Sequence, residues 1–417
     1  MSEVMTLANR AREAAQRLGT TSTEQRNRAL LAMAHALTHK QDEVLEANAK
    51  DMEAAKAKNV SPALLDRLEL NPTRLKSMSE ALKALSLLPD PIGEIVEGHT
   101  LPNGVQLSKI RVPLGVVAII FEARPNVTAD AAGLCVKTGN AVILRGGSLA
   151  SNSNIALTRV LSAAATNAGI PDGSVQCVES TDREAAEELM SLHGYVDVLI
   201  PRGGSGLIKS VVENAKVPVI ETGVGNCHVY VHSGADSNMA RRIVVNAKCQ
   251  RPGVCNAAET LLCDDAVHGA ILPPILKELE ENGVTIYGDD ATRALGAVMR
   301  IERATEEDWA TEYLDLKIAV KVVSGLDEAI RHINTYGTGH SEAIITEDYS
   351  AGQRFLREVD AAAVYINAST RFTDGGEFGM GAEIGISTQK LHARGPMGLD
   401  ALTSTKFVAM GTGQIRE

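Results

Sequence analysis

The chain has 417 residues, of which 44% are apolar, enough to fill more than one buried core. Its formal charge of −11 argues against a broad nucleic-acid-binding surface, because such surfaces are normally basic. With one Trp and five Phe, the chain also lacks an aromatic platform on which single strands could stack. We therefore expect a globular protein without a nucleic-acid partner.

The cysteines and the apolar runs bear on compartment and membranes. The six cysteines include no CxxC pair and no Cys/His cluster at zinc spacing, so neither a metal nor a disulfide framework is expected. The N-terminal segment mixes both charge signs and lacks the apolar core of a secretory signal. The longest apolar run, 112–121, contains Pro113 and Gly115 and is far shorter than the roughly 20 residues that span a bilayer. We expect a soluble, cytoplasmic protein with free thiols and no membrane partner.

The first 90 residues are predicted to be helical. Apolar residues recur at spacings of three and four from Ala29 to Leu37, and Thr21 or Ser22 can cap that helix. The following stretch, 95–113, has two β-prone arms around Pro-Asn-Gly, which predicts a hairpin. This hairpin precedes any sheet, so we expect it to project from the body.

Short apolar runs then alternate with helical stretches, a pattern typical of parallel βαβ units. The first series of expected strands is GVVAIIF, AVILR, SVQCV, VDVLIP and VPVIE, with helices at 127–138, 149–168, 181–192 and 205–213. The second series is CHVYV, ETLLC, GVTIY, KIAVKVV, EAIIT and AVYIN, with helices near 267–283 and 326–335. The fold class is therefore α/β, with two lobes of parallel-rich sheet joined by a hinge at 221–226.

Two glycine turns follow predicted strands and precede predicted helices. They are RGGS at 145–148 and RGGS at 202–205. Backbone N–H groups at such turns can approach a phosphate or a ribose, although the glycines could equally serve only to make tight turns. Neither turn is a GxGxxG fingerprint, so a dinucleotide would bind in an unusual way.

Cys255 lies in RPGVCNA, where Pro252 and Gly253 shape a bend after a helix that ends near Gln250. A free cysteine is most often a core residue, but a polar, glycine-containing turn is a poor place for core packing. A nucleophilic role therefore stands beside the packing role. The cysteines within apolar runs, Cys135, Cys177 and Cys263, are expected to be packing residues, as are Cys227 and Cys249.

Several segments together resemble the gamma-glutamyl phosphate reductase family of the aldehyde dehydrogenase superfamily. They are GVVAIIFEARPNVTADAAGLCVKTGNAVILRGGS, IPRGGSGL, IETGVGNCHVYV, RPGVCNAAETLL and YGTGHSEAIIT. The stretch 323–345 is specific to these reductases. The resemblance covers nearly the whole chain.

The resemblance implies an aldehyde-dehydrogenase-like fold in three parts. Residues 1–94 and 113–224 would form the NADP-binding domain, and 225–385 the catalytic domain. The hairpin 95–112 and the C-terminal strand in 400–417 would mediate homo-oligomerisation, as a dimer or tetramer.

The resemblance also implies an activity. NADPH would reduce L-glutamyl 5-phosphate to L-glutamate 5-semialdehyde and phosphate through a cysteine thioester, in the second step of proline biosynthesis from glutamate. Glutamate 5-kinase would supply the labile acyl phosphate and could contact this protein transiently. The alternatives are another superfamily member, CoA-acylating or hydrolytic, and a non-catalytic nucleotide-binding assembly module.

Site residues carry over position by position. Cys255 matches the nucleophile, and Asn126 matches the amide that faces the developing oxyanion. Glu221 matches the general base of oxidising relatives, and Glu312 matches the glutamate that holds the nicotinamide ribose. The cofactor-binding set is Arg145, Gly146, Gly147, Ser148, Gly203, Gly204, Ser205, Glu221 and Glu312.

The chain departs from the superfamily pattern at two places. The lysine and glutamate that grip the adenosine ribose are here Arg145 and Ser148, and a guanidinium in place of a carboxylate favours a 2'-phosphate, hence NADPH. ETGVGN replaces ELGGK, which weakens a base role for Glu221. A base that activated water would also hydrolyse the thioester, and the reductive reaction has no need of one.

The substrate carries a phosphate, a carboxylate and an ammonium group, so cationic and mixed polar partners are expected. An ordinary thiol, with a pKa of about 8.5, also needs cationic help to ionise at neutral pH, and Arg251 is the nearest charge in sequence, unless it only forms a surface salt bridge. Ser341 could instead be a cap, and Arg371 a plain surface charge. The substrate candidates are Arg124, Lys137, Arg251, His340, Ser341, Glu342 and Arg371.

Overall fold

A computed structural model describes residues 2–296 and 300–416 of the chain. The chain forms two compact units. Unit 1 comprises residues 1–222, 379–385 and 397–417, and unit 2 comprises 223–378 and 386–396. Met1 and Glu417, the outermost residues of the predicted segments 1–94 and 400–417, lie outside the described residues.

Unit 1 begins with the predicted run of helices. They are α1 (Glu3–Leu18), α2 (Thr23–His39), α3 (Gln41–Ala57), α4 (Pro62–Leu68) and α5 (Pro72–Leu87). Of the two cap candidates it is Ser22 that caps α2, since its hydroxyl accepts the Gln25 N–H at 3.2 Å. The helical prediction for the first 90 residues is confirmed.

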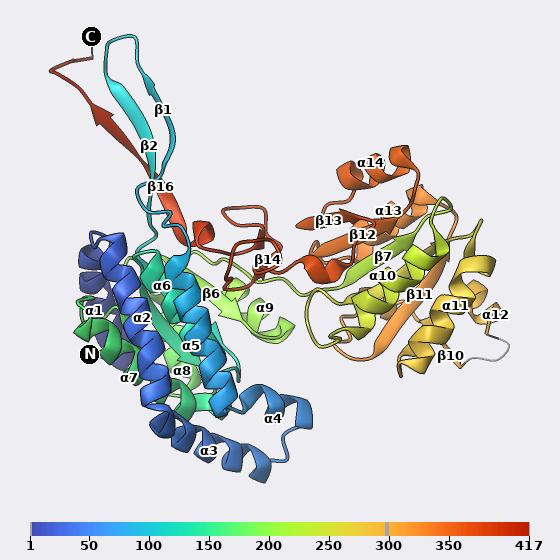
Figure 1. Ribbon diagram of the computed structural model, residues 1–417, viewed down its shortest axis with the longest axis horizontal. Coiled ribbons are helices and arrows are strands. Elements are labelled where there is room, and N and C mark those ends of the chain that lie inside the picture. Colours follow the sequence, from blue (N-terminus) through green and yellow to red (C-terminus); the bar gives the residue numbers. More distant parts are fainter. Residues whose placement is uncertain (1, 297–299, 417) are drawn as a thin grey trace. The chain divides into compact units, whose positions relative to one another are not determined.

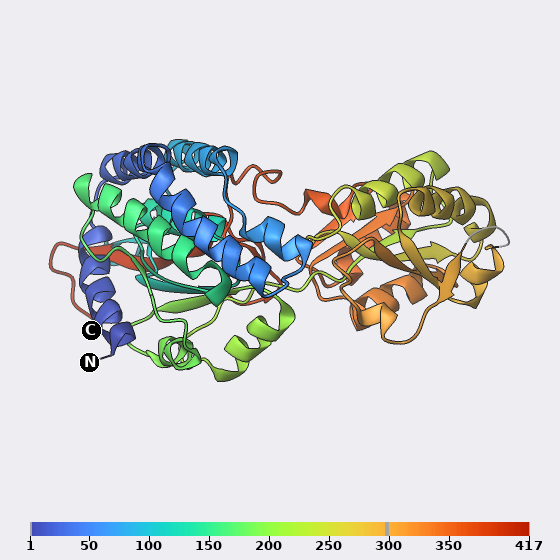
Figure 2. The same ribbon diagram turned by 90° about the horizontal axis from the view of Figure 1, so that it is seen from below.

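A four-stranded parallel sheet forms the core of unit 1, with the strand order β5-β4-β3-β6. The strands are β3 (Val116–Phe121), β4 (Ala141–Gly146), β5 (Val175–Cys177) and β6 (Val198–Arg202). The connecting helices are α6 (Asn126–Lys137), η1 (Ser148–Ala150) with α7 (Ser151–Asn167), α8 (Arg183–Ser191) and α9 (Ser205–Asn214). In unit 1, α6 and α7 cover one face of the sheet, with α2 and α5 packed outside them, and α1, α8 and α9 lie on the other face (Figure 2). Coverage of both faces explains the continuous apolar runs of these strands.

One predicted strand of unit 1 is wrong. Residues 217–221, VPVIE, run beside β6 and exchange backbone hydrogen bonds with Leu199, but the pairing is only an isolated bridge between Leu199 and Val219. Pro218 has no N–H to donate, so it cannot continue a ladder of hydrogen bonds.

The predicted hairpin and the C-terminal strand form a separate antiparallel sheet (Figure 1). Strands β1 (Ile95–Thr100) and β2 (Gln106–Pro113) are joined by a turn in which Gly104 has φ 85°, a conformation that glycine adopts without strain. Strand β16 (Thr403–Met410) pairs with β2 along its whole length. The C-terminal strand therefore adds a third strand to the hairpin.

Unit 2 contains a seven-stranded, all-parallel sheet in the order β10-β9-β11-β8-β7-β12-β13. The strands are β7 (Cys227–Val231), β8 (Ala258–Asp264), β9 (Thr285–Gly288), β10 (Ile301–Arg303), β11 (Lys317–Val323), β12 (Ser341–Ile345) and β13 (Ala363–Ile366). Apolar residues of α10 (Ser237–Cys249) and α11 (His268–Glu281) pack on one face, and those of α13 (Leu326–Tyr336) and α14 (Tyr349–Glu358) pack on the other. The second α/β lobe is confirmed, with β10, α14 and the short helix α12 (Asp290–Ala294) in addition to the expected elements.

Short elements complete the chain. They are the 3-10 turns η2 (Asp308–Ala310), η3 (Thr370–Phe372) and η4 (Asp400–Leu402), and the antiparallel pair β14 (Ile386–Ser387) and β15 (Gly395–Pro396). Of the helices in the described part of the chain, none combines the length and the apolar character that crossing a bilayer requires.

Candidate active site

Cys255 lies in unit 2, on the loop between α10 and β8, and is half-buried. Its carbonyl oxygen accepts a hydrogen bond from the Cys227 thiol at 3.2 Å. All six cysteines are free thiols. Burial raises the pKa of Cys177 and of Cys263 to about 12 and that of Cys135 still further, as expected for packing residues.

Gly225, just before β7, packs closely against the backbone of the Cys255 loop. A Cβ atom at this position would lie 1.5 Å from the Cys255 carbonyl oxygen and 2.6 Å from its Cα, so any side chain would displace the Cys255 backbone. The Gly225 N–H donates to Glu312 Oε1 at 2.7 Å. Gly225, the second glycine of ETGVGN, therefore contacts both the Cys255 backbone and the Glu312 carboxylate within unit 2.

Glu312 lies on a segment held by a buried ion pair that the sequence did not reveal. Lys248 Nζ lies 2.6 Å from Glu259 Oε2, and both side chains are fully buried. The other carboxylate oxygen of Glu259 accepts the Leu314 N–H at 3.2 Å, where Leu314 has φ 53°. Burial raises the pKa of Glu259 to about 7, while the Lys248 charge lowers it. The signal in the sequence was weak, because Lys248 is one of three basic residues in α10 and Glu259 is one of two acidic residues in β8.

Arg371 in η3 lies against the loop that carries Cys255. Its guanidinium donates to Gln250 Oε1 at 2.8 Å and to Asn256 Oδ1. Arg251 is exposed, and its charge lowers the pKa of Arg371. Two of the predicted substrate cations, Arg251 and Arg371, thus lie close together beside the Cys255 loop.

The predicted substrate residues His340, Ser341 and Glu342 lie at the start of β12 and are fully buried. Glu342 Oε2 accepts the His228 N–H at 2.7 Å and lies 3.0 Å from His228 Nδ1. Burial raises the pKa of Glu342 and lowers that of His340 to about 4, so this imidazole is neutral at pH 7. These side chains have protein partners inside unit 2, and we leave them out of the substrate contacts proposed below.

In unit 1, β4 and β6 flank β3 in a parallel sheet, so both glycine turns lie at one edge. Gly146 is required by packing, because a Cβ there would lie 1.9 Å from Asn154 Nδ2. Gly147 and Gly204 would meet protein atoms only at 3.4 Å or beyond. Gly147 is half-buried and Gly204 is exposed, with Ser148, Gly203 and Ser205 beside them, which leaves room for the close approach of a nucleotide phosphate or ribose.

Arg145, at the end of β4, fits an anionic group of a cofactor. Its Nη2 donates to the carbonyl oxygens of Thr181 and Asp182 at 3.0 and 3.1 Å. Its Nε is buried, and within the described residues no hydrogen-bond partner for it is found. Buried donors are normally satisfied, so a guanidinium anchored on one side with a donor left over fits a phosphate oxygen.

Asn126 begins α6 and is exposed. Its Nδ2 donates to Asp130 Oδ2 at 3.2 Å, one helical turn along. Burial raises the pKa of Asp130 to about 6, while the hydrogen bond from Asn126 and the Arg202 charge lower it. Asp130 was not singled out from the sequence, although the i, i+4 spacing from Asn126 was visible there.

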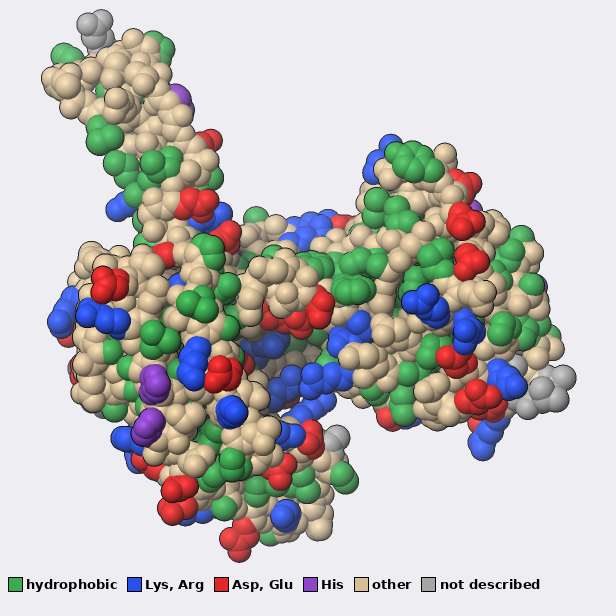
Figure 3. Space-filling view, viewed as in Figure 1, with side chains coloured by type: hydrophobic (Ala, Val, Ile, Leu, Met, Phe, Trp, Pro, Cys, Tyr) green, Lys and Arg blue, Asp and Glu red, His purple; other side chains and the backbone are tan. Residues whose placement is uncertain are grey.

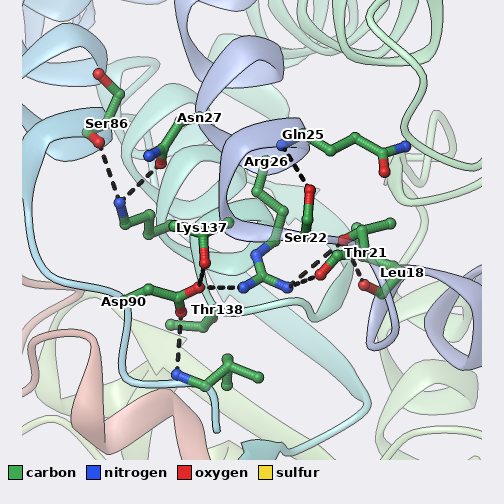
Figure 4. Close-up of polar contacts among 12 residues, drawn as sticks. Leu18, Thr21, Ser22, Gln25, Arg26, Asn27, Ser86, Asp90, Lys137 and Thr138 are labelled. Atoms are coloured by element: carbon green, nitrogen blue, oxygen red, sulfur yellow. Dashed lines mark hydrogen bonds and ion pairs between the residues drawn. The ribbon is translucent and has the colours of Figure 1, made fainter. Parts of the chain in front are cut away.

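The remaining candidates in unit 1 differ in exposure. Arg124 is exposed on the segment between β3 and α6. Glu221 is half-buried and lies next to the last residue of the first segment of unit 1, 1–222. Lys137 is fully buried, and its amine donates to Asn27 Oδ1 at 2.8 Å and to the Ser86 carbonyl at 3.1 Å. Figure 4 shows Lys137 beside the Arg26–Asp90 ion pair under the N-terminal helices. We therefore also leave Lys137 out of the substrate contacts proposed below.

Among residues 2–296 and 300–416, no group of three or more His, Cys, Asp or Glu side chains is arranged to hold a metal ion.

Comparisons with known proteins are consistent over the whole chain. The family model described as aldehyde dehydrogenase family matches residues 1–308 and 318–408. A gamma-glutamyl phosphate reductase of Moorella thermoacetica is 61% identical over 415 residues, covering 100% of this chain and 99% of the relative. That of Carboxydothermus hydrogenoformans is 59% identical over 416 residues, covering 100% of both.

Solved structures agree. A crystal structure of gamma-glutamyl phosphate reductase from Thermotoga maritima is 48% identical with a TM-score of 0.97, covering 100% of both chains. An acetylating aldehyde dehydrogenase of Geobacillus thermoglucosidasius, 19% identical with a TM-score of 0.70 over 100% of this chain and 98% of the other, shares the fold. The chain therefore belongs to the aldehyde dehydrogenase family and, within it, to the gamma-glutamyl phosphate reductases.

Proposed function

We propose that this protein reduces L-glutamyl 5-phosphate to L-glutamate 5-semialdehyde and phosphate, the second step of proline biosynthesis from glutamate. The observation that carries the proposal is the identity of 61% over the whole chain with a relative named for that reaction. The cysteine on a glycine-supported loop supplies the chemistry that an acyl phosphate requires.

Cys255 is the proposed nucleophile. Its thiolate attacks the 5-acyl carbon, and the tetrahedral adduct expels phosphate to leave an acyl thioester on the sulfur. When bound, the nicotinamide cofactor supplies a hydride to the acyl carbon. Cys255 then holds a thiohemiacetal, which collapses to the aldehyde and the free thiol.

Asn126 and the Cys255 backbone N–H are the proposed donors to the oxyanion that develops at the acyl carbon. One such donor is typically worth about 3 to 4 kcal/mol, or 10²- to 10³-fold in rate. Glu221 has no proposed role as a base, because activated water would hydrolyse the thioester to glutamate. We keep it, with Glu312, among the cofactor contacts.

Membership of the aldehyde dehydrogenase family implies a nicotinamide cofactor. We propose that it is NADPH, held by the two glycine turns and by Arg145. The anchored guanidinium with its unpartnered Nε supports a contact to the 2'-phosphate. Arg145→Glu should raise the KM for NADPH at least tenfold and leave that for NADH within about twofold; equal changes for both would contradict the assignment.

The substrate phosphate is proposed to meet exposed or half-buried cations, namely Arg124, Arg251 and Arg371. We place the reaction in the cytoplasm, because free thiols such as Cys255 persist in a reducing compartment. Direct transfer of the acyl phosphate from glutamate 5-kinase is a further proposal, motivated by the lability of that compound. A coupled mixture in which a trap for free acyl phosphate abolishes semialdehyde formation would count against it.

The reverse reaction tests the activity directly. Wild-type protein should reduce NADP⁺ with glutamate semialdehyde only when phosphate is present, and Cys255→Ser should lose this activity. Oxidation that proceeds without phosphate would indicate a hydrolytic relative, and oxidation that requires coenzyme A instead would indicate an acylating one. Either result would overturn the proposal.

A further inference from the structure

A cysteine nucleophile acts as its thiolate, and an ordinary thiol is only a few per cent ionised at neutral pH. A nearby cation increases the thiolate fraction. Sequence proximity points to Arg251, but the structure brings a second and better-fixed cation, Arg371, to the same loop.

The Arg371 guanidinium spans the turn that carries Cys255. Its Nε donates to Gln250 Oε1 at 2.8 Å, five residues before the nucleophile, and its Nη1 donates to Asn256 Oδ1, directly after the nucleophile. Cys255 lies between these two anchors in the chain, so the guanidinium plane is held against the loop from both sides.

One of the two anchors, Asn256, is itself held in place. Asn256 is only 4% exposed. Its Nδ2 donates to the Thr373 carbonyl at 2.9 Å, and its own carbonyl accepts from Thr370 Oγ1 at 2.8 Å. The 3-10 turn that carries Arg371 and the loop that carries Cys255 are thereby fastened together.

The charge of Arg371 is not cancelled by these partners, because both acceptors are neutral amide oxygens. Burial lowers the pKa of Arg371 and the Arg251 charge lowers it further, whereas Asp374, Cys255 and Cys227 raise it. The attraction between a guanidinium and a thiolate is mutual, so the Arg371 charge also favours the thiolate form of Cys255. Cys227 is fully buried and stays a neutral thiol, because burial raises its pKa.

We propose that Arg371 stabilises Cys255 as the thiolate in the substrate-free protein, as a positioning residue in the activation of the nucleophile. This inference rests on the proposed role of Cys255. It differs from a role of Arg371 in binding the substrate phosphate alone, because it predicts an effect before any substrate arrives.

The test is the pH dependence of Cys255 alkylation by iodoacetamide in protein without substrate or cofactor, followed by mass spectrometry of the Cys255 peptide. In Arg371→Gln the pH midpoint of alkylation should move upward and the rate at pH 7 should fall about three- to tenfold. Arg371→Lys keeps the charge and should retain most of the wild-type rate. Arg303→Gln, at an exposed arginine of the same unit, is the control and should leave the midpoint unchanged.

An unchanged midpoint in folded Arg371→Gln would overturn the proposal, and a raised KM for phosphate in that variant would then assign Arg371 to phosphate binding only. If thermal unfolding shows that this variant is not folded, Gln250→Glu replaces it, because Gln250 is exposed and a carboxylate there neutralises Arg371 in place. An unchanged midpoint in Gln250→Glu would overturn the proposal equally. Failure of the nucleophile role itself would show separately, as phosphate-dependent activity in Cys255→Ser.

Discussion

The side-chain amide of Asn126 is oriented by the carboxylate of Asp130, which accepts a hydrogen bond from Asn126 Nδ2 at 3.2 Å. An amide group that is free to flip presents nitrogen or oxygen with similar ease. With one N–H fixed on Asp130, the second can be presented to a developing oxyanion. The proposed oxyanion contact of Asn126 would therefore depend on the protonation state of Asp130.

We predict that kcat for the wild type falls as pH drops through about 6, because protonation of Asp130 removes the charged acceptor. Burial raises the pKa of this carboxyl to about 6. Asp130→Asn should lose this acid limb and run about five- to tenfold slower at pH 8, since a charged hydrogen bond becomes a neutral one. Identical pH profiles for the two proteins would contradict the positioning role.

The same substitution should stabilise the fold. The pKa of Asp130 is higher in the folded protein than its ordinary 3.8. The protonated Asp130 therefore makes its full contribution to the stability of the wild type below about pH 4, and this contribution is lost as pH rises through 6. Asp130→Asn does not titrate and should exceed wild type by about 1 to 3 kcal/mol at pH 8, with no gain at pH 4. Thermal unfolding of both proteins across this range measures the difference.

Gly225 is the residue at which the loop geometry is most constrained. Gly225→Ala should abolish activity and lower Tm, because its Cβ would overlap the Cys255 carbonyl oxygen and the loop would have to move. Gly269→Ala, in a helix where an added Cβ meets nothing within 4 Å, is the matched control and should keep activity and gain slightly in stability. An active Gly225→Ala protein would show that the loop position does not matter.

At the scale of elements, the ion pair between α10 and β8 ties the nucleophile loop to the segment that carries Glu312. Two fully buried charges repay their desolvation only while both are present. The pair also supplies the acceptor for the Leu314 N–H, so its loss should affect cofactor binding as well as stability.

Lys248→Met should therefore cost about 3 to 5 kcal/mol in the free energy of unfolding, since it leaves Glu259 buried without a countercharge. The double variant Lys248→Met/Glu259→Leu should recover to within about 2 kcal/mol of wild type, the remainder being the unpaired Leu314 N–H. Urea titration of the single and double variants checks this. A single variant as stable as wild type would rule out the bridge as a structural element.

Elements with a strong local pattern were predictable, and the exceptions have physical reasons. The buried parallel strands β3 and β4 show in the sequence as the apolar runs VVAIIF and AVIL, because both faces of their sheet are covered. The same kind of run at 217–221 was misleading, because Pro218 prevents pairing beyond an isolated bridge. The edge strand β10 has three residues and mixed polarity, too little pattern to stand out.

The candidate site was predictable only in part. Cys255, Asn126 and the glycine turns carry local motifs. Arg371 reaches the Cys255 loop only through the tertiary packing of segments distant in sequence. Asp130 is one helical turn from Asn126, but its burial, like that of Lys248 and Glu259, is set by packing. Lys137 and Glu342 looked like free charges and proved to be buried with partners, because burial cannot be read from a charged residue type alone.

For the whole molecule, the antiparallel sheet of β1, β2 and β16 carries hydrophobic side chains into solvent (Figure 3). Ile95 is 64% exposed and Phe407 is 65% exposed. Both edge strands also have unpaired backbone groups, which invite pairing with another chain. We propose that a second copy of this chain covers the sheet.

Phe407→Glu should accordingly raise the dissociation constant of the oligomer at least tenfold relative to the wild type, as measured by sedimentation equilibrium. Leu391→Glu, at an exposed apolar residue of unit 2, is the control and should leave the oligomer unchanged. A monomeric wild type, or an oligomer unaffected by Phe407→Glu, would contradict this use of the sheet.

The central claim is that the acyl group is carried by Cys255 before it is reduced. The most direct measurement is the mass of the intact protein and of its Cys255 peptide after mixing with enzymatically generated L-glutamyl 5-phosphate in the absence of any nicotinamide nucleotide. The account predicts a glutamyl adduct on this peptide that disappears on addition of NADPH and does not form in Cys255→Ser. A wild-type protein that turns over yet shows no adduct, or an adduct on another residue, would contradict it.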